Sequence, residues 1–206
     1  MSKVRLLFFL VVLVVVLWVS SQFMGAMASQ GGSKLAAALH LGASSDDLYP
    51  VAGAPTISAE FINRVLSAYG SPAVGTGQQL YDLGVQYGID PVYALAFFLH
   101  EDSFGKTGWG AVNHSLGNSR CSGWSVCQGG FRAYATWADG YQDWYNLILN
   151  GYVHGQVSMP IVGRVCTTVS QIVPVYAPSS DHNDVVGYIA AVEHAVDTWR
   201  AGRIWV

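Results

Sequence analysis

Hydrophobic residues recur at helical spacing in several segments of the chain, and capping or breaking residues bound these segments. Apolar positions three and four residues apart predict amphipathic α-helices, and the residues at their ends indicate where each helix begins and stops. We predict six helices, over residues 58–69, 78–87, 91–101, 137–151, 165–172 and 184–200. Because no strand-rich region and no repeat lies among them, the expected fold is mainly α.

Several details of these helices are specific predictions. Val85 is expected to face inward from the second helix, Pro174 to follow the end of the fifth, and Asn183 to cap the sixth. Thr136 and Asp139 have the spacing of a capping box at the start of the fourth helix.

The third helix differs from the others because every residue from 92 to 99 is apolar. Such a helix is expected to be buried on all sides. Asp90 can cap its N-terminus, and Pro91 suits the first helical position because it has no N–H to leave unpaired. The helix ends at Glu101, a charged residue that is out of place there unless it is used. Glu101 is therefore the first candidate for a catalytic acid.

Three features predict a raised pKa for the Glu101 carboxyl. It follows an apolar helix, it lies at the negative end of the helix dipole, and Asp102 beside it adds like charge. A carboxyl that stays protonated near neutral pH can act as a general acid on a glycosidic oxygen. The alternative is a solvated helix-end residue that is bonded to loop amides, since perturbed carboxylates are only probabilistic markers of function.

A long segment without helical periodicity, 102–130, follows Glu101. A loop of this length is uncommon in a compact domain and is usually functional. Its composition is rich in glycine, with Gly105, Gly108, Gly110, Gly117, Gly123, Gly129 and Gly130.

Two cysteines in this loop, Cys121 and Cys127, bracket a short segment that a disulfide can close. Cys166 is then the odd cysteine, either buried or free. Neither a C-x-x-C spacing nor a Cys/His quartet is present, so we expect no metal site and no cofactor. His100 and His114 flank Glu101, but packed or surface histidines explain them better than metal ligands.

Aromatic residues make up 13% of the chain, including seven Trp. Trp109 and Trp124 lie in the loop, where their rings can stack on sugars or anchor the loop. Arg132 follows the loop and can pair with a carboxylate in a cleft or lie on the surface. These three residues are candidates for substrate binding.

The N-terminus has the features of a secretory signal: Lys3 and Arg5, an apolar run over 6–19, and Ala-Met-Ala at 26–28. An uncleaved membrane anchor is the alternative, because the apolar region is long enough to span a bilayer. On either interpretation the rest of the chain lies outside the membrane on the extracytoplasmic side, secreted or anchored.

The chain then divides into three regions by composition. Residues 1–28 are the signal or anchor, residues 29–55 are a flexible linker rich in Ala, Gly and Ser, and residues 56–206 are the folded domain. Without the two N-terminal basic residues, 8 basic residues stand against 13 acidic ones. This balance argues against binding to nucleic acid, which requires a basic surface.

Several motifs together resemble the endo-β-N-acetylglucosaminidase-like peptidoglycan hydrolases, the glucosaminidase domains of bacterial autolysins and flagellar muramidases. The resemblance extends over about residues 56–200. It rests on Gly88-Ile-Asp-Pro91, the apolar helix, Glu101-Asp-Ser-Phe-Gly105, Asn113 to Asn118, Phe131-Arg-Ala-Tyr134, the aromatic helix after it, Tyr176-Ala-Pro178 and Asp181-His-Asn183.

This resemblance implies a lysozyme-like helical domain that acts on peptidoglycan or a related N-acetylhexosamine glycan. Glu101 matches the family's acid glutamate, Asn113 belongs to a looser version of its Asn-containing loop, and Tyr134 matches an aromatic residue that lines the sugar groove. One departure bears on mechanism: no Asp or Glu lies between Asp102 and Asp139, where some members carry a second carboxylate.

Three mechanisms need only one carboxyl. The N-acetyl group of the substrate can attack the anomeric carbon, a loop residue or Tyr134 can position water, or the enzyme can be a lytic transglycosylase. We favour hydrolysis assisted by the substrate or by Tyr134, with Glu101 and Tyr134 as the catalytic residues. A glucosaminidase-like domain that binds glycan without cleaving it is the alternative from another class of proteins.

Overall fold

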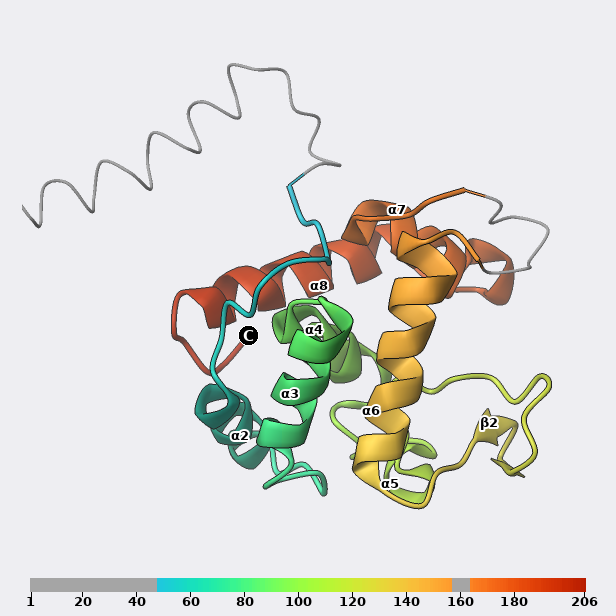
Figure 1. Cartoon of the computed structure of the whole chain (residues 1–206), viewed down its shortest axis with the longest axis horizontal. Coiled ribbons are helices and arrows are strands. Elements are labelled where there is room, and N and C mark those ends of the chain that lie inside the picture. Colours follow the sequence, from blue (N-terminus) through green and yellow to red (C-terminus); the bar gives the residue numbers. More distant parts are fainter. Residues whose placement is uncertain (1–47, 157–163) are drawn as a thin grey trace, which may run out of the picture. The chain divides into compact units, whose positions relative to one another are not determined.

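The computed structural model describes residues 48–156 and 164–206 (Figure 1). The predicted signal or anchor and most of the predicted linker lie outside these residues. Within the described part of the chain, none of the helices combines the length and the apolar character that crossing a bilayer requires.

Helices dominate the described part of the chain. Seven α-helices are present in it: α2 (Ala59–Ala68), α3 (Gly77–Tyr87), α4 (Pro91–Asp102), α5 (Gly110–Asn113), α6 (Trp137–Asn146), α7 (Val169–Tyr176) and α8 (Val185–Arg200). A π-helical segment, Leu147–Val153, continues α6. Two short antiparallel strands, β1 (Cys127–Gln128) and β2 (Phe131–Arg132), pair with Cys127 opposite Arg132. The domain is therefore mainly helical, as predicted, with a minimal sheet.

Helix α4 lies at the centre of the domain, with α8 and α3 packed against it (Figure 1). The residues from Pro91 to Phe98 are all buried, so the prediction of a helix enclosed on every side is confirmed. Phe98 stacks on Tyr141 of α6, and Phe97 contacts Tyr188 of α8. The aromatic residues of α6 and α8 thus complete the core around α4.

The N-terminus of α4 is held by the buried carboxylate of Asp90. One oxygen of Asp90 accepts hydrogen bonds from the backbone N–H groups of Val92 and Thr56, both at 3.1 Å. The other accepts from the Thr56 hydroxyl at 2.6 Å and from the Arg200 guanidinium at 3.0 Å. This cap therefore also ties the start of α4 to the end of α8 and to the chain before α2.

The folded domain begins earlier than the predicted boundary at residue 56. Val51 is buried, its N–H donates to the carbonyl of Thr167, and its carbonyl accepts from Asp90. Tyr49 bonds Asp197 through its hydroxyl and Val169 through its carbonyl. Because these are mostly backbone contacts, the Ala-, Gly- and Pro-rich composition of the segment did not indicate them.

Three helix details differ from the predictions. Val85 is 54% exposed, because α3 turns Gly77, Leu80 and Gly84 toward its neighbours instead. Pro174 lies inside α7, where burial of Val169, Ile172 and Val173 offsets the loss of one backbone hydrogen bond.

At the start of α8 the cap is Asp184, which accepts from the Gly187 N–H. Asn183 donates instead to the Pro178 carbonyl, so it is not the cap. The loop 102–130 contains α5 and β1, which its sparse periodicity did not predict.

The Asp90 network gives a test of stability. We expect Asp90→Asn to lower the free energy of unfolding by about 1.5–3 kcal/mol, because it removes charge-assisted hydrogen bonds from Arg200 and Thr56. Asp184→Asn is the matched control: it is also a helix N-cap, but an exposed one, and should cost less than about 0.5 kcal/mol since Asn still caps. Urea unfolding measures both. Equal losses would show that Asp90 acts only as a cap.

Candidate functional site

Glu101 lies in the last turn of α4, where it is half-buried. Its Oε1 accepts a hydrogen bond from the Tyr188 hydroxyl of α8 at 2.6 Å, and the Asn118 side chain also bonds the carboxyl. Burial raises the pKa of Glu101, while the hydrogen bonds from Tyr188 and Asn118 act in the opposite direction. The sequence predicted the direction of this shift correctly.

Asp102, the next residue, is almost fully buried and has a different role. Its Oδ1 accepts the Gly105 N–H at 2.7 Å, while Oδ2 has no hydrogen-bond partner among the described residues. Burial, and secondly the charge of Glu101, raise the pKa of Asp102 to about 7. The Gly110 backbone covers Oδ2 so closely that a Cβ there would lie 1.6 Å from it. Asp102 therefore anchors the turn after α4 and does not face a cleft.

Backbone strain is found on both segments that adjoin Glu101. Ser103 and Phe104 have positive φ angles of 53° and 59°, and Asn118 has one of 44°. The left-handed region costs a non-glycine residue roughly 1–2 kcal/mol, so tertiary contacts must hold it. Phe104 is fully buried, and its carbonyl accepts from the Ser71 hydroxyl at 2.8 Å. Such strain is common at functional sites.

Aromatic side chains enclose the carboxyl of Glu101. Tyr188 is buried, and the ring of His100 stacks on it with centroids 3.8 Å apart. Tyr176 donates a hydrogen bond to the Gly117 carbonyl. Burial, and then the negative charge of Glu101, raise the pKa of both tyrosines well above 10, so both hydroxyls stay neutral. His100 is thus an exposed residue that covers Tyr188 with one face of its ring, and partial burial lowers its pKa.

A second polar group forms between the end of the loop and α6. The guanidinium of Arg132 contacts both carboxylate oxygens of Asp143, at 2.8 and 3.0 Å, and the Tyr134 hydroxyl donates to Asp143 at 2.6 Å. The Arg132 guanidinium also lies 4.9 Å from the ring of Trp124, which contacts Tyr134. Arg132 therefore pairs with a carboxylate, one of the two alternatives that its position suggested.

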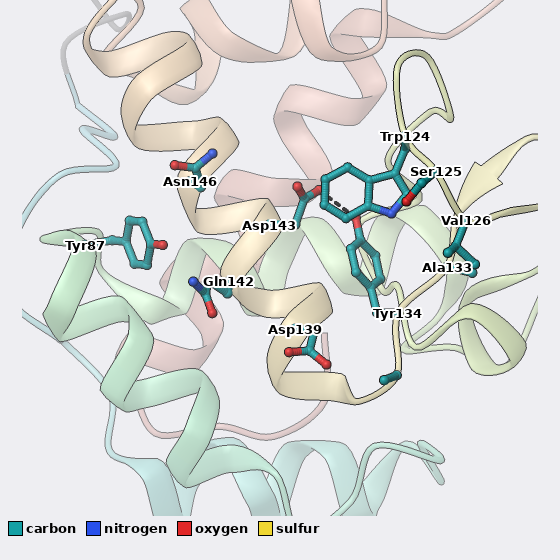
Figure 2. A pocket seen from close by; sticks show the side chains of 11 residues that line it. Tyr87, Trp124, Ser125, Val126, Ala133, Tyr134, Asp139, Gln142, Asp143 and Asn146 are labelled. Atoms are coloured by element: carbon teal, nitrogen blue, oxygen red, sulfur yellow. Dashed lines mark hydrogen bonds between the residues drawn. The ribbon is translucent and has the colours of Figure 1, made fainter.

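This group borders a groove of about 510 Å³ between α6, the end of α3 and the loop (Figure 2). Its lining is aromatic and polar: Tyr87, Trp124, Ser125, Val126, Ala133, Tyr134, Ala135, Asp139, Gln142, Asp143 and Asn146. Glu101 is not among the lining residues. The structure therefore brings Trp124, Arg132 and Tyr134 together, but it places Glu101 outside their groove.

The hydroxyl of Tyr134 is occupied by protein partners. It donates to Asp143 and bonds the Ser119 side chain, and burial together with Asp143 raises its pKa above the ordinary value. A hydroxyl that already bonds two protein groups has little capacity left to position water. Its position in the groove supports a role in binding more than the predicted role in catalysis.

Two of the predicted substrate-binding residues lie elsewhere. Asn113 is 0% exposed and donates to the Gln128 carbonyl at 3.0 Å, so its side chain supports the hairpin and is not available to a ligand. Trp109 is 41% exposed, but its ring packs against the backbone of Gly129, outside the groove. For Trp109 the structure favours the loop-anchoring alternative.

The loop that carries Trp124 is closed by a disulfide between Cys121 and Cys127, whose Cα atoms are 5.8 Å apart. Cys166 is a free, buried cysteine. Within the described ranges, no group of three or more His, Cys, Asp or Glu side chains is placed to bind a metal ion.

Sequence reasoning missed three residues of these sites: Tyr188, Asn118 and Asp143. Tyr188 had a detectable signal, because it lies one turn before the buried Val192 on the inward face of α8. A tyrosine there needs a partner for its hydroxyl. Asp143 was overlooked because the search for a second carboxylate stopped at Asp139.

A comparison with protein-family models found no model that matches the chain, and a comparison with curated proteins found no matching sequence. The family resemblance therefore stays a prediction that rests on the motif residues.

Removal of the Tyr188 hydroxyl tests the environment of Glu101. Because that hydrogen bond favours the carboxylate, Tyr188→Phe should raise the pKa of Glu101 further. Tyr176→Phe is the control, since it removes a buried hydroxyl that bonds a carbonyl and not Glu101. Carboxyl NMR titration of the labelled protein measures the shift. An unchanged or lowered pKa in Tyr188→Phe would contradict the assignment.

Asp102 predicts a pH dependence of stability. Its folded-state pKa of about 7 lies above the ordinary value of 3.8, so the folded state holds this proton more tightly than the unfolded state. Stability from this residue is fully present below about pH 4 and is lost as the pH rises toward 7.

Asp102→Asn should remove a pH dependence on the order of 2–4 kcal/mol between pH 4 and 8. Urea unfolding across this range measures it, with the exposed Asp82→Asn as control. If Asp102→Asn keeps the full slope, another group carries it.

Proposed function

We propose that this domain is an extracytoplasmic glycoside hydrolase that cleaves β-1,4 bonds between N-acetylhexosamine units of peptidoglycan, with Glu101 as general acid. The observation that carries the proposal is a partly accessible carboxyl whose pKa is raised by burial and whose orientation is fixed by Tyr188 and Asn118. A general acid needs both a proton near neutral pH and a fixed direction. The lysozyme-like character of the helical fold belongs to this proposal.

In the proposed reaction Glu101 gives its proton to the glycosidic oxygen as the C1–O bond breaks. Tyr188 occupies Oε1 as a donor, so we assign the transferred proton to Oε2. As that bond breaks, the carbonyl oxygen of the substrate's own N-acetyl group bonds C1 from the opposite face. Water then attacks C1 and displaces the acetamido oxygen, and its proton passes to Glu101, which restores the acid.

The environments of the neighbouring carboxyls support a mechanism with a single carboxyl. Asp102 is buried under Gly110. Asp143 is paired with the Arg132 guanidinium and accepts a hydrogen bond from the Tyr134 hydroxyl. Neither carboxyl is arranged as the nucleophile or base that a two-carboxyl glycosidase requires.

The single carboxyl of Glu101, with its raised pKa and fixed orientation, also favours a second candidate. This is a lytic transglycosylase, in which the substrate's own C6 hydroxyl attacks C1. The closed Cys121–Cys127 disulfide and the N-terminal apolar segment support a location outside the cytoplasm for either enzyme.

Glu101→Gln tests the proposal on purified peptidoglycan. We expect at least about a hundredfold loss of glycan cleavage, since general acid catalysis contributes on the order of 10²–10⁴. Glu60→Gln makes the same chemical change at an exposed residue of α2 and should leave activity intact. Zymograms and turbidity measure the rate.

Mass spectrometry of the products separates the candidates, because hydrolysis leaves reducing ends and a transglycosylase leaves anhydro ends. Full activity in Glu101→Gln would overturn the assignment of the acid. Inactive wild-type protein would favour a domain that only binds glycan.

A further inference from the structure

Glu101 is held between two segments that are far apart in the sequence. The first is the loop segment 117–120, whose Asn118 side chain bonds the Glu101 carboxyl. The second is the segment 176–188, from the end of α7 to the first turn of α8, whose Tyr188 hydroxyl donates to the same carboxyl at 2.6 Å. Because each segment contributes one partner of Glu101, the seam between the two segments borders the carboxyl.

Two side-chain contacts join the segments across this seam, one with a buried partner and one exposed to solvent. The Tyr176 hydroxyl donates to the carbonyl of Gly117, which is buried. The Arg120 guanidinium donates to the Asp181 carboxylate at 3.0 Å, and these two side chains are 77% and 44% exposed. The Tyr176 contact therefore fixes one side of the seam, whereas the ion pair closes the side that faces solvent.

The backbone beside each partner of this ion pair is strained. Asn118, two residues before Arg120, has a φ of 44°, and His182, directly after Asp181, has a φ of 65°. A residue with a side chain holds such a left-handed conformation only where the surrounding structure enforces it. Release of the ion pair therefore removes a contact that helps to hold both strained residues.

The exposure of the Arg120–Asp181 pair limits how strongly it can hold the seam. Ion pairs in contact with solvent shift an equilibrium by roughly fivefold at most, and salt weakens them further. The Arg132–Asp143 pair is different, because its side chains are only 25% and 10% exposed. A weak, solvent-accessible pair suits a contact that opens and closes more than it suits a permanent link.

We propose that Arg120 and Asp181 form a latch across the seam, which restricts access to Glu101 when the ion pair is closed and admits larger molecules when it opens. Asn118 lies on the same segment as Arg120, so opening also loosens one of the two hydrogen bonds that orient the carboxyl. The latch goes beyond the proposed function, because it controls access to this carboxyl whether or not Glu101 acts as an acid.

Chemical labelling of the Glu101 carboxyl in the full chain tests the latch. The probe is a water-soluble carbodiimide with glycine ethyl ester, and mass spectrometry gives the initial rate at Glu101 relative to Glu60 on α2 of the same molecule. Arg120→Gln and Asp181→Asn should each raise this ratio roughly two- to fivefold, because either change breaks the pair. Arg203→Gln is the matched control: it removes an exposed arginine beyond the far end of α8 and should leave the ratio unchanged.

Salt and charge reversal separate the latch from a general loosening of the fold. High salt should raise the labelling ratio in the parent but not in Arg120→Gln, which has no pair left to screen. The double variant Arg120→Asp, Asp181→Arg restores opposite charges and should label more slowly than either single variant. The latch is overturned if neither single variant raises the ratio, if Arg203→Gln raises it as much, if salt acts equally on Arg120→Gln, or if the double variant labels as fast as the single ones. None of these outcomes depends on glycan cleavage, so the latch and the proposed enzyme can fail separately.

Discussion

The burial of α4 from Pro91 to Phe98 is the constraint on which the rest of the structure depends. With apolar side chains on every face of the helix, only its two ends can carry polar groups without a desolvation penalty. At the first end, Asp90 is satisfied by four hydrogen bonds, one of them from Arg200. At the other end, Glu101 receives only partial compensation from Tyr188 and Asn118, so burial is the dominant effect on its pKa.

Three carboxyls near the site show how environment separates residues of the same chemistry. Asp102 is buried with one oxygen bonded and the other covered by backbone, which suits a structural anchor. Asp143 has a guanidinium and a hydroxyl against it, which suits a residue that orients its neighbours. Glu101 is partly exposed, accepts from two directed hydrogen-bond donors, and has a pKa that burial raises. Spacing along the chain does not distinguish these environments.

The sequence could predict the features that depend on local patterns, but not those that depend on contacts between distant segments. Helix α4, its Asp90 cap and the Thr136–Asp139 capping box depend on local patterns, and the structure contains all three. The partnership of Glu101 with Tyr188 joins residues 87 positions apart, and no local pattern encodes it. Asn113 was misjudged for the same reason, because its burial depends on the hairpin that folds over it and not on its own segment.

The strain next to Glu101 has a function if the site is catalytic. Ser103 and Phe104 are in the left-handed region, so α4 ends at Asp102. The turn that follows covers Asp102 and leaves Glu101 partly exposed. A left-handed Asn118 brings an amide to the same carboxyl from a distant segment. Together with two carboxyls of raised pKa, these conformations destabilise the fold near neutral pH. The large aromatic core around α4, in which every residue from Pro91 to Phe98 is buried, offsets that cost.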